Sequence, residues 1–172
     1  MRLTHASAAA IAAALALSFA SDSTAQALPR ALQADRLVVH KADRTLTLYW
    51  HGAKLKSYRI ALGGQPLGPK SARGDQRTPE GLYTVSRRRK KTDFHAALVL
   101  SYPNADDLAR AKLAGVSPGG GIEIHGLRDG FGWLGSAHVL FDWTDGCIAV
   151  TNVEIDELVR AVPDGTPVEV LP

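Results

Sequence analysis

The chain has 172 residues and a formal net charge of +3, with 20 lysines and arginines against 17 aspartates and glutamates. A charge this small argues against nucleic acid as a partner, because nucleic-acid-binding domains gather a clear excess of basic residues. Cys147 is the one cysteine in the chain, which excludes an internal disulfide.

The first 27 residues have the pattern of a secretory signal peptide. Arg2 gives a positive start, residues 8–20 form an uncharged apolar run, and Ala25-Gln26-Ala27 supplies a small-residue cleavage site. We therefore expect cleavage after Ala27 and export to the periplasm. No cysteine lies near this site, so a lipidated N-terminal cysteine is not expected. An uncleaved N-terminal anchor is the alternative.

The remaining sequence predicts a short tether over residues 28–35 and one domain over residues 36–172, a length that suits a single core. Alternation of apolar and polar residues predicts strands, and clustered glycine and proline over residues 63–81 predict a long turn region. The expected strands cover residues 37–40, 45–50, 55–62, 82–85, 97–100, 122–125 and 166–171.

Two helices are expected beside these strands. The first covers residues 101–115, with Asn104 as its cap and Gly115 as its stop. The second follows a capping box of Thr151 and Glu154, and its apolar residues recur at helical spacing. The basic run over residues 87–91 is expected in a solvated loop between two strands. The domain is therefore expected to be mainly β with two short flanking helices.

Cys147 is the strongest candidate for chemistry. A lone thiol in an oxidising compartment is a liability unless it is used, although a buried apolar cysteine is the structural alternative. Gly146 precedes it, so backbone and substrate can approach closely, and backbone N–H groups around such a turn can hold an oxyanion. A thiol also needs a neighbouring base, because it is a weak nucleophile at its free pKa.

Two histidines compete for the role of that base. His125 ends a predicted strand and is followed by Gly126, whereas His138 lies nine residues before Cys147. Adjacent strands could bring His125 to the thiol, which favours it over His138. Of the other histidines after the signal peptide, His40 and His51 belong to the opening hairpin, and His95 could line a groove.

These residues resemble the signature of the L,D-transpeptidase catalytic domain, the YkuD-like family. Residues 124–126 (IHG) and 144–148 (TDGCI) are similar to the family's His-Gly pair and its Ser/Thr-His-Gly-Cys motif. Residues 77–83 (RTPEGLY) are similar to the Thr-Pro-x-Gly-x-Tyr/Phe stretch upstream, and the early hairpin with residues 46–49 also matches. The resemblance covers roughly residues 36–171. It implies a mixed β-sandwich or barrel-like sheet pair.

The resemblance also implies roles for individual residues. Cys147 would be the nucleophile and His125 the general base, with the carbonyl of Gly126 orienting the imidazole. Backbone amides of Gly146 and Cys147 would form the oxyanion hole, and no cofactor or metal would be needed. The residues expected to contact substrate are Thr144, Asp145, His138, Trp143, Arg77 and His95.

In the family, the cysteine attacks the peptide bond that follows diaminopimelate in a peptidoglycan tetrapeptide stem, and D-alanine leaves. An amine acceptor then gives a 3-3 cross-link or an attached protein, whereas water gives trimming or release. The expected partner is therefore the peptidoglycan stem, and the basic residues 87–91 could contact an anionic wall polymer instead of only solvent. A groove is expected beside residues 63–81 and 87–91, with a Cys147 thiol of low pKa beside the imidazole.

Two departures from the family pattern leave the acceptor open. Asp145 stands where most members have histidine, and Ala149 stands where many have arginine or asparagine. These changes indicate a divergent subgroup, some of whose members hydrolyse rather than cross-link. Asp145 is expected to bind substrate or to act on His138.

Other classes of protein remain as alternatives. A sortase would use Arg160 with the same cysteine and histidine, but the glycine before Cys147 fits that class poorly. A papain-like protease would present its cysteine before its histidine, the reverse of the order here. A zinc site could draw on His125, His138, Asp142 and Cys147. A peptidoglycan-binding module that has lost turnover is the non-enzymatic alternative.

Overall fold

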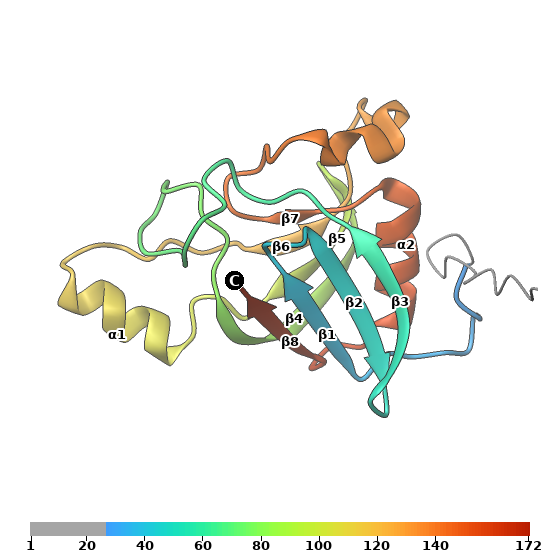
Figure 1. Ribbon diagram of the computed structural model, residues 1–172, viewed down its shortest axis with the longest axis horizontal. Coiled ribbons are helices and arrows are strands. Elements are labelled where there is room, and N and C mark those ends of the chain that lie inside the picture. Colours follow the sequence, from blue (N-terminus) through green and yellow to red (C-terminus); the bar gives the residue numbers. More distant parts are fainter. Residues whose placement is uncertain (1–26) are drawn as a thin grey trace, which may run out of the picture.

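The computed structural model describes residues 27–172, so the predicted signal peptide, apart from its last residue, lies outside the described part. Eight strands and three short helices follow one another in this part of the chain (Figure 1). The strands are β1 (Arg36–His40), β2 (Thr45–Trp50), β3 (Ala53–Arg59), β4 (Gly81–Thr92), β5 (His95–Leu100), β6 (Glu123–His125), β7 (Ile148–Ala149) and β8 (Pro167–Leu171). The helices are α1 (Ala105–Leu113), the 3-10 helix η1 (Gly132–Leu140) and α2 (Asn152–Ala161).

The strands form one mixed sheet in the order β3-β2-β1-β8-β4-β5-β6-β7. Its two edges approach each other, because Ala61, just after β3, pairs with Ala149 of β7, and Gly63 pairs with Thr144. Each of the two bridges joins segments that are far apart in the sequence. The mainly β, barrel-like prediction is confirmed.

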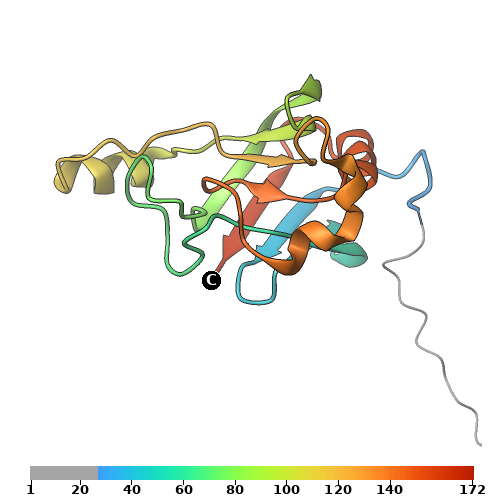
Figure 2. The same ribbon diagram turned by 90° about the horizontal axis from the view of Figure 1, so that it is seen from above.

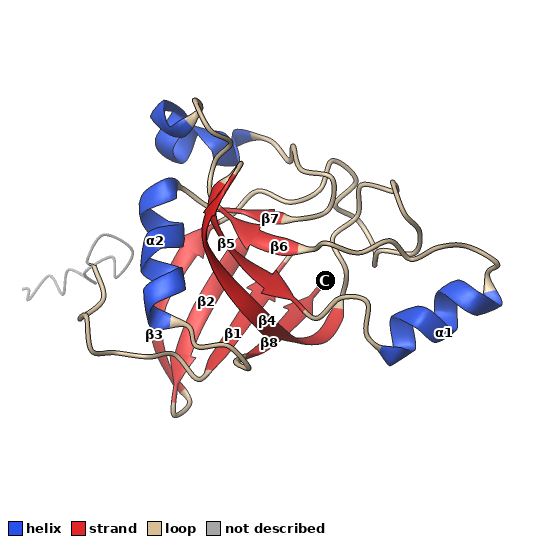
Figure 3. Ribbon diagram, turned by 180° about the vertical axis from the view of Figure 1, so that it is seen from behind, coloured by secondary structure: helices blue, strands red, loops and turns tan. Residues whose placement is uncertain are grey.

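The hydrophobic core fills the space that this curved sheet encloses. Leu37, Leu46, Leu98 and Ile124 are buried there from four different strands. Helix α2 packs against the sheet beside β5 and adds Ile155, Leu158 and Val159 to the same side (Figure 3). The apolar residues that predicted this helix are therefore its buried face.

Capping explains where the two α-helices begin. The side chain of Thr151 accepts from the Glu154 amide, and Glu154 accepts from the Thr151 backbone in return, as the capping box predicted. Asn104 and Asp107 make the same reciprocal pair at α1. Helix α1 is shorter than expected because Ser101 still pairs with Thr84 in the sheet. Figures 1 and 2 show α1 projecting away from the sheet.

The prediction of a loop over residues 87–91 is wrong, because these residues continue β4. The first residues of β4 pair with β8, but from Arg87 onward β4 pairs only with β5. The basic side chains are all exposed, so no apolar alternation marks the strand in the sequence. Backbone pairing with β5 holds this half of β4 in place, together with ion pairs of Arg88 with Asp164 and of Arg89 with Glu123.

The segment expected as a tether, residues 28–35, contacts the domain. The Ala34 amide donates to the Ala161 carbonyl at 2.7 Å, and the Asp35 amide donates to the Tyr49 carbonyl at 3.0 Å. Leu28 and Ala34 are buried. Over residues 27–172, no helix has the length and apolar character needed to cross a membrane.

Candidate active site

A cavity of about 700 Å³ opens beside β6, β7 and η1. Its walls combine the cysteine, two histidines and several aromatic side chains with charged residues. The lining residues are Arg89, Thr92, Asp93, Phe94, Gly121, Glu123, His125, Leu127, Arg128, Phe131, Leu134, His138, Phe141, Trp143, Thr144, Asp145 and Cys147. The size and the mixture of apolar walls with a few polar groups are typical of a small-molecule or peptide site.

Pairing of β6 with β7 brings Cys147 and His125 to the same cavity. The two strands are parallel, with His125 opposite Ala149, two residues after the cysteine. His125 ends β6 and Cys147 comes just before β7, so both side chains lie at one edge of the sheet. The Cys147 thiol contacts the Gly121 carbonyl oxygen at 3.5 Å. The structure therefore places the predicted nucleophile and the predicted base on one cavity wall.

The ring of His125 is held in one orientation. Its Nδ1 lies 2.6 Å from the carbonyl oxygen of Gly126, and because a carbonyl only accepts, the proton is on Nδ1. The other nitrogen, Nε2, therefore carries the lone pair that can accept a proton. The Phe94 ring lies 4.6 Å and the Trp143 ring 5.8 Å from the imidazole, centroid to centroid. Burial, which leaves His125 3% exposed, lowers its pKa despite the Gly126 bond.

The expectation of a low pKa for Cys147 is wrong. Burial raises the pKa of the thiol to about 11. The backbone hydrogen bond at Glu123 works against this rise, while the negative charges of Glu123 and Asp145 add to it. Lys70 lowers the pKa by a smaller amount. The resting site therefore holds a neutral thiol and a neutral imidazole rather than a preformed ion pair.

A tight turn fixes the backbone before Cys147. The Thr144 hydroxyl donates to the Cys147 carbonyl at 2.7 Å and accepts from the Gly146 amide at 3.1 Å. Gly146 has φ +121°, and a Cβ there would lie 2.5 Å from the Arg77 carbonyl oxygen. Only glycine fits this position without strain. The amides of Gly146 and Cys147 were both expected to form the oxyanion hole. Because the Gly146 amide already donates to Thr144, only the Cys147 amide of this pair is left to bind an oxyanion.

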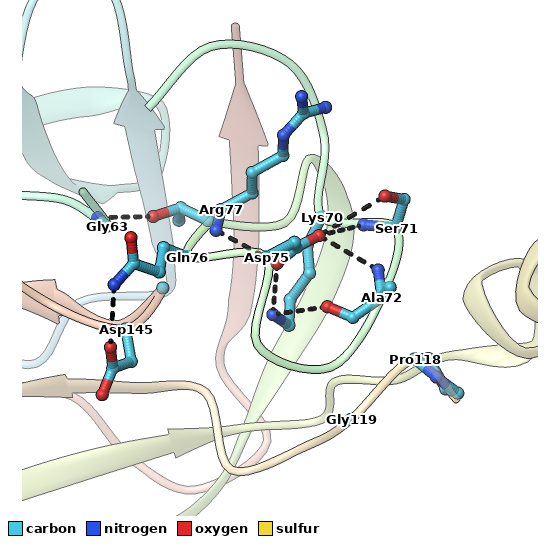
Figure 4. Close-up of polar contacts among 12 residues, drawn as sticks. Gly63, Lys70, Ser71, Ala72, Asp75, Gln76, Arg77, Pro118, Gly119 and Asp145 are labelled. Atoms are coloured by element: carbon cyan, nitrogen blue, oxygen red, sulfur yellow. Dashed lines mark hydrogen bonds and ion pairs between the residues drawn. The ribbon is translucent and has the colours of Figure 1, made fainter. Parts of the chain in front are cut away.

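Asp145 is exposed at the cavity and contacts the loop of residues 63–81. Gln76 Nε2 donates to Asp145 Oδ1 at a marginal 3.5 Å (Figure 4). The loop itself is tied by Asp75, which accepts from Lys70 at 2.7 Å and from the Ser71 amide at 2.7 Å. Burial alone would raise the pKa of Asp75, but these hydrogen bonds hold it well below its usual range. The loop beside Asp145 is therefore anchored internally.

His138 and Trp143 carry buried polar atoms without partners in the wall of the cavity. His138 is 2% exposed, and neither of its ring nitrogens has a hydrogen-bond partner among the described residues. The same holds for the indole Nε1 of Trp143. Burial, and to a smaller extent the neighbouring His125, lowers the pKa of His138, while Glu154 opposes the shift. Both residues contribute to the cavity wall, but these nitrogens are themselves buried.

Three other predicted residues lie elsewhere. Arg77 borders Gly146 through its backbone, but its side chain extends away from Asp145 in Figure 4 and is absent from the cavity lining. His95 pairs with Asp156 of α2 at 3.0 Å, outside that lining. Asp142, which the zinc alternative would use, pairs with Arg44 at 2.8 Å. Among residues 27–172, no three His, Cys, Asp or Glu side chains cluster to hold a metal ion.

Sequence reasoning did not anticipate η1 or the apolar residues around it. Phe131, Leu134 and Phe141 line the cavity from this segment, which Figures 1 and 2 show outside the sheet in orange. Gly135, with φ 48° and ψ −131°, breaks the helical conformation in the middle of the segment. The apolar residues of this segment therefore do not recur at helical spacing, and the sequence gives no sign of a helix. The cluster of aromatic residues over 131–143 was the available signal.

Comparison with known proteins agrees with this geometry. The family model described as the L,D-transpeptidase catalytic domain, YkuD, matches residues 34–170. YafK of Escherichia coli (strain K12), provisionally named an L,D-transpeptidase, is 34% identical over 130 residues, which cover 72% of this chain and 45% of YafK. The chain thus matches less than half the length of this relative.

Solved structures give the same fold. The helical cell shape determining protein Pgp2 from Campylobacter jejuni is 27% identical with a TM-score of 0.62, covering 81% of this chain and 48% of Pgp2. An L,D-transpeptidase from Mycobacterium smegmatis is similar in fold alone, at 16% identity and a TM-score of 0.54, covering 81% of this chain and 59% of that one. The sheet order, the cavity with Cys147 and His125, and the match over residues 34–170 together establish that this chain belongs to the L,D-transpeptidase catalytic domain (YkuD) family.

Proposed function

We propose that this protein is an exported cysteine L,D-transpeptidase that acts on peptidoglycan tetrapeptide stems in the periplasm. The observation that carries the proposal is the fixed tautomer of His125. Its Nδ1–H donates to the Gly126 carbonyl, which leaves Nε2 as a base in the cavity that Cys147 also lines. This pairing supports a covalent reaction at sulfur rather than simple binding.

The neutral resting pair determines the order of proton transfers. As Sγ of Cys147 attacks the substrate carbonyl carbon, Nε2 of His125 takes the thiol proton. The Cys147 amide stabilises the oxyanion. The C–N bond then breaks, the imidazolium returns its proton to the leaving amine, and D-alanine departs. An incoming amine, or water, attacks the thioester after giving a proton to Nε2, and the thiol is restored.

The cavity walls support a peptide substrate that carries carboxylates. Arg128 supplies positive charge at the cavity, where a stem carboxylate would lie, whereas Arg89 is paired with Glu123 at 3.0 Å. The aromatic and apolar side chains of Phe94, Phe131 and Trp143 would pack against the aliphatic part of the stem. Thr144 and Asp145 lie beside the thiol and would contact the residues that flank the scissile bond.

The relatives support a role in the cell wall. Pgp2 is a cell shape determining protein by its own description, and its matching region spans about half of that protein. Remodelling of the cell wall through Cys147 would be consistent with a role in cell shape. Asp145 carries an exposed negative charge where histidine is common in the family. This charge would act in the second half of the reaction, when the acyl group passes to its acceptor. The carboxylate would attract an ammonium acceptor or orient water.

The test is incubation of the protein with purified muropeptides beside a Cys147→Ala control, read by mass spectrometry. We expect 3-3 dimers or exchanged D-amino acids with the wild type and none with the control. Shortened or released peptides without dimers would assign the same thiol to hydrolysis. No change in either sample would overturn the enzymatic proposal in favour of a peptidoglycan-binding module.

A further inference from the structure

Glu157 of α2 is the centre of a buried polar cluster that the catalytic cavity does not include. The side chain is 5% exposed. Its Oε2 accepts from Lys56 Nζ at 2.6 Å and from the Tyr58 hydroxyl at 2.8 Å. Its Oε1 accepts from the backbone nitrogen of Leu28 at 2.5 Å, with Arg160 more distant at 3.8 Å. The start of the described chain is thus bound to a buried carboxylate.

Leu28 is also the residue that follows the Ala25-Gln26-Ala27 cleavage motif. Its side chain is 9% exposed and belongs to the hydrophobic core, whereas Ala27 is exposed. The predicted scissile bond therefore lies at the boundary where the chain enters the folded domain. The sequence motif and the buried contact are independent observations, and they select the same residue.

We propose that cleavage between Ala27 and Leu28 creates an α-ammonium group that docks on Glu157 as an ion pair of the mature protein. Hydrolysis by a signal peptidase adds the elements of water to this peptide bond. The hydroxyl goes to the Ala27 carbonyl carbon and the proton to the Leu28 nitrogen, which is an ammonium at neutral pH. A neutral amide donor becomes a charged one at the same Oε1. The proposal does not depend on the reaction at Cys147.

The charges around Glu157 favour this exchange. Burial alone would raise the pKa of Glu157, but the bonds from Lys56, Leu28 and Tyr58 outweigh it, so the carboxylate is ionised. Lys56 holds Oε2, and Oε1 has the Leu28 nitrogen as its close donor. Glu154 and Glu157 line the same small cavity as Ala27, so two carboxylates face the new charge alongside Lys56 and Arg160. Charge-assisted bonds of this kind are about twice as strong as neutral ones.

Room for the free amine comes from the removal of Ala27. That residue forms part of the wall of the same cavity, together with Thr151 and Val153. Once it has left, the ammonium can turn its remaining protons toward the cavity while Leu28 stays packed in the core. The mature N-terminus is therefore a structural element of the fold and not a free end.

The experiment begins with the full chain of 172 residues, exported through its own leader from a bacterial host. Intact mass and N-terminal sequencing should show Leu28 as the first residue. The protein is then treated with an amine-acetylating reagent at neutral pH, with the exposed Lys54 as an internal reference for reactivity. A paired, buried ammonium gives up its proton reluctantly, so we expect its acetylation to be at least about tenfold slower than that of a free α-amine.

A matched variant keeps every side chain and displaces only the charge. Insertion of one serine between Ala27 and Leu28 leaves the Leu28 amide on Glu157 but moves the ammonium one residue outward. We expect this variant to acetylate at the rate of a free amine and to have a Tm several degrees lower. Equal acetylation rates in the two proteins, or a first residue other than Leu28, would overturn the proposal.

Glu157→Gln provides a second arm. It should raise the acetylation rate of the wild-type N-terminus to that of the serine insertion, whereas Asp156→Asn, on the exposed side of the same helix, should leave the rate unchanged. If Glu157→Gln does not fold because Lys56 loses its partner, the serine insertion still decides the question. A slow rate that persists in folded Glu157→Gln would contradict the ion pair.

Discussion

His125 is oriented by the backbone carbonyl of Gly126, at 2.6 Å from Nδ1, and not by a carboxylate. A carbonyl fixes the tautomer but offers no negative charge to stabilise an imidazolium. Packing enforces the arrangement, because a Cβ on Gly126 would lie 2.7 Å from the Asn152 side-chain oxygen and 2.9 Å from Ile155 Cγ2. The imidazole is thus held at the junction between β6 and α2.

Replacement of His125 tests its role as the base. We expect His125→Ala to lower the rate of acyl-enzyme formation by about 10² to 10⁴-fold, the range for loss of a general base. His51→Asn is a suitable control, because His51 is exposed in a hairpin turn with φ 49°, a conformation that asparagine tolerates. A rate for His125→Ala within twofold of the control would assign proton transfer to another group.

The pH dependence of thiol alkylation tests the state of Cys147. Because the pKa of the thiol is raised to about 11, the rate with iodoacetamide should keep rising through pH 9 and 10 instead of levelling near pH 8. Asp145→Asn removes a negative charge that raises this pKa, so its profile should shift toward lower pH. Asp43→Asn, in the exposed β1–β2 turn, should not shift it. A plateau below pH 8 would indicate a preformed thiolate.

Acid should destabilise the domain through its buried histidines. The pKa values of His125 and His138 are lowered in the folded state from an ordinary 6.5, so below about pH 6.5 the unfolded chain binds more protons than the folded one. The free energy of unfolding should therefore decrease as the pH falls from 7 toward 5. Urea titrations at several pH values measure this slope. His138→Leu should make the slope shallower, and an unchanged slope would show that folding does not lower the pKa of His138.

Thr144 is expected to position the nucleophile through its hydroxyl. Thr144→Val keeps the shape but removes the bonds to the Cys147 carbonyl and the Gly146 amide, leaving both without their Thr144 partner. The loss should cost about 1–3 kcal/mol of stability and lower the acylation rate. Thr144→Ser restores the hydroxyl and should recover both the melting temperature and the rate. If Thr144→Ser is as impaired as Thr144→Val, the methyl group and not the hydroxyl holds the turn.

Local signals explain which parts of the fold were predictable. The capping box of Thr151 and Glu154, the alternation in residues 45–50 and the glycine before Cys147 are each encoded within a few residues. The neighbourhood of His125 and Cys147 followed from the strands that carry them, together with the resemblance of their motifs to a known family.

The failures have a common physical cause, which is dependence on distant segments. The basic half of β4 is a strand because β5 supplies its hydrogen bonds, and nothing in its own side chains shows this. The pKa of Cys147 depends on burial by residues from several elements, so the sequence around the thiol suggested the wrong direction. The sequence also could not show that the Gly146 amide donates to the Thr144 hydroxyl, because this bond depends on the conformation of the turn.

The bridge between Ala61 and Ala149 has a consequence for the order of folding. It joins the segment after β3 to the strand that follows Cys147, so this edge of the sheet closes only when both distant parts of the chain are present. Contacts of such long sequence separation form slowly, because the intervening loop must first be ordered. An incompletely folded chain would thus carry an ordinary thiol, and the cavity around Cys147 would assemble last.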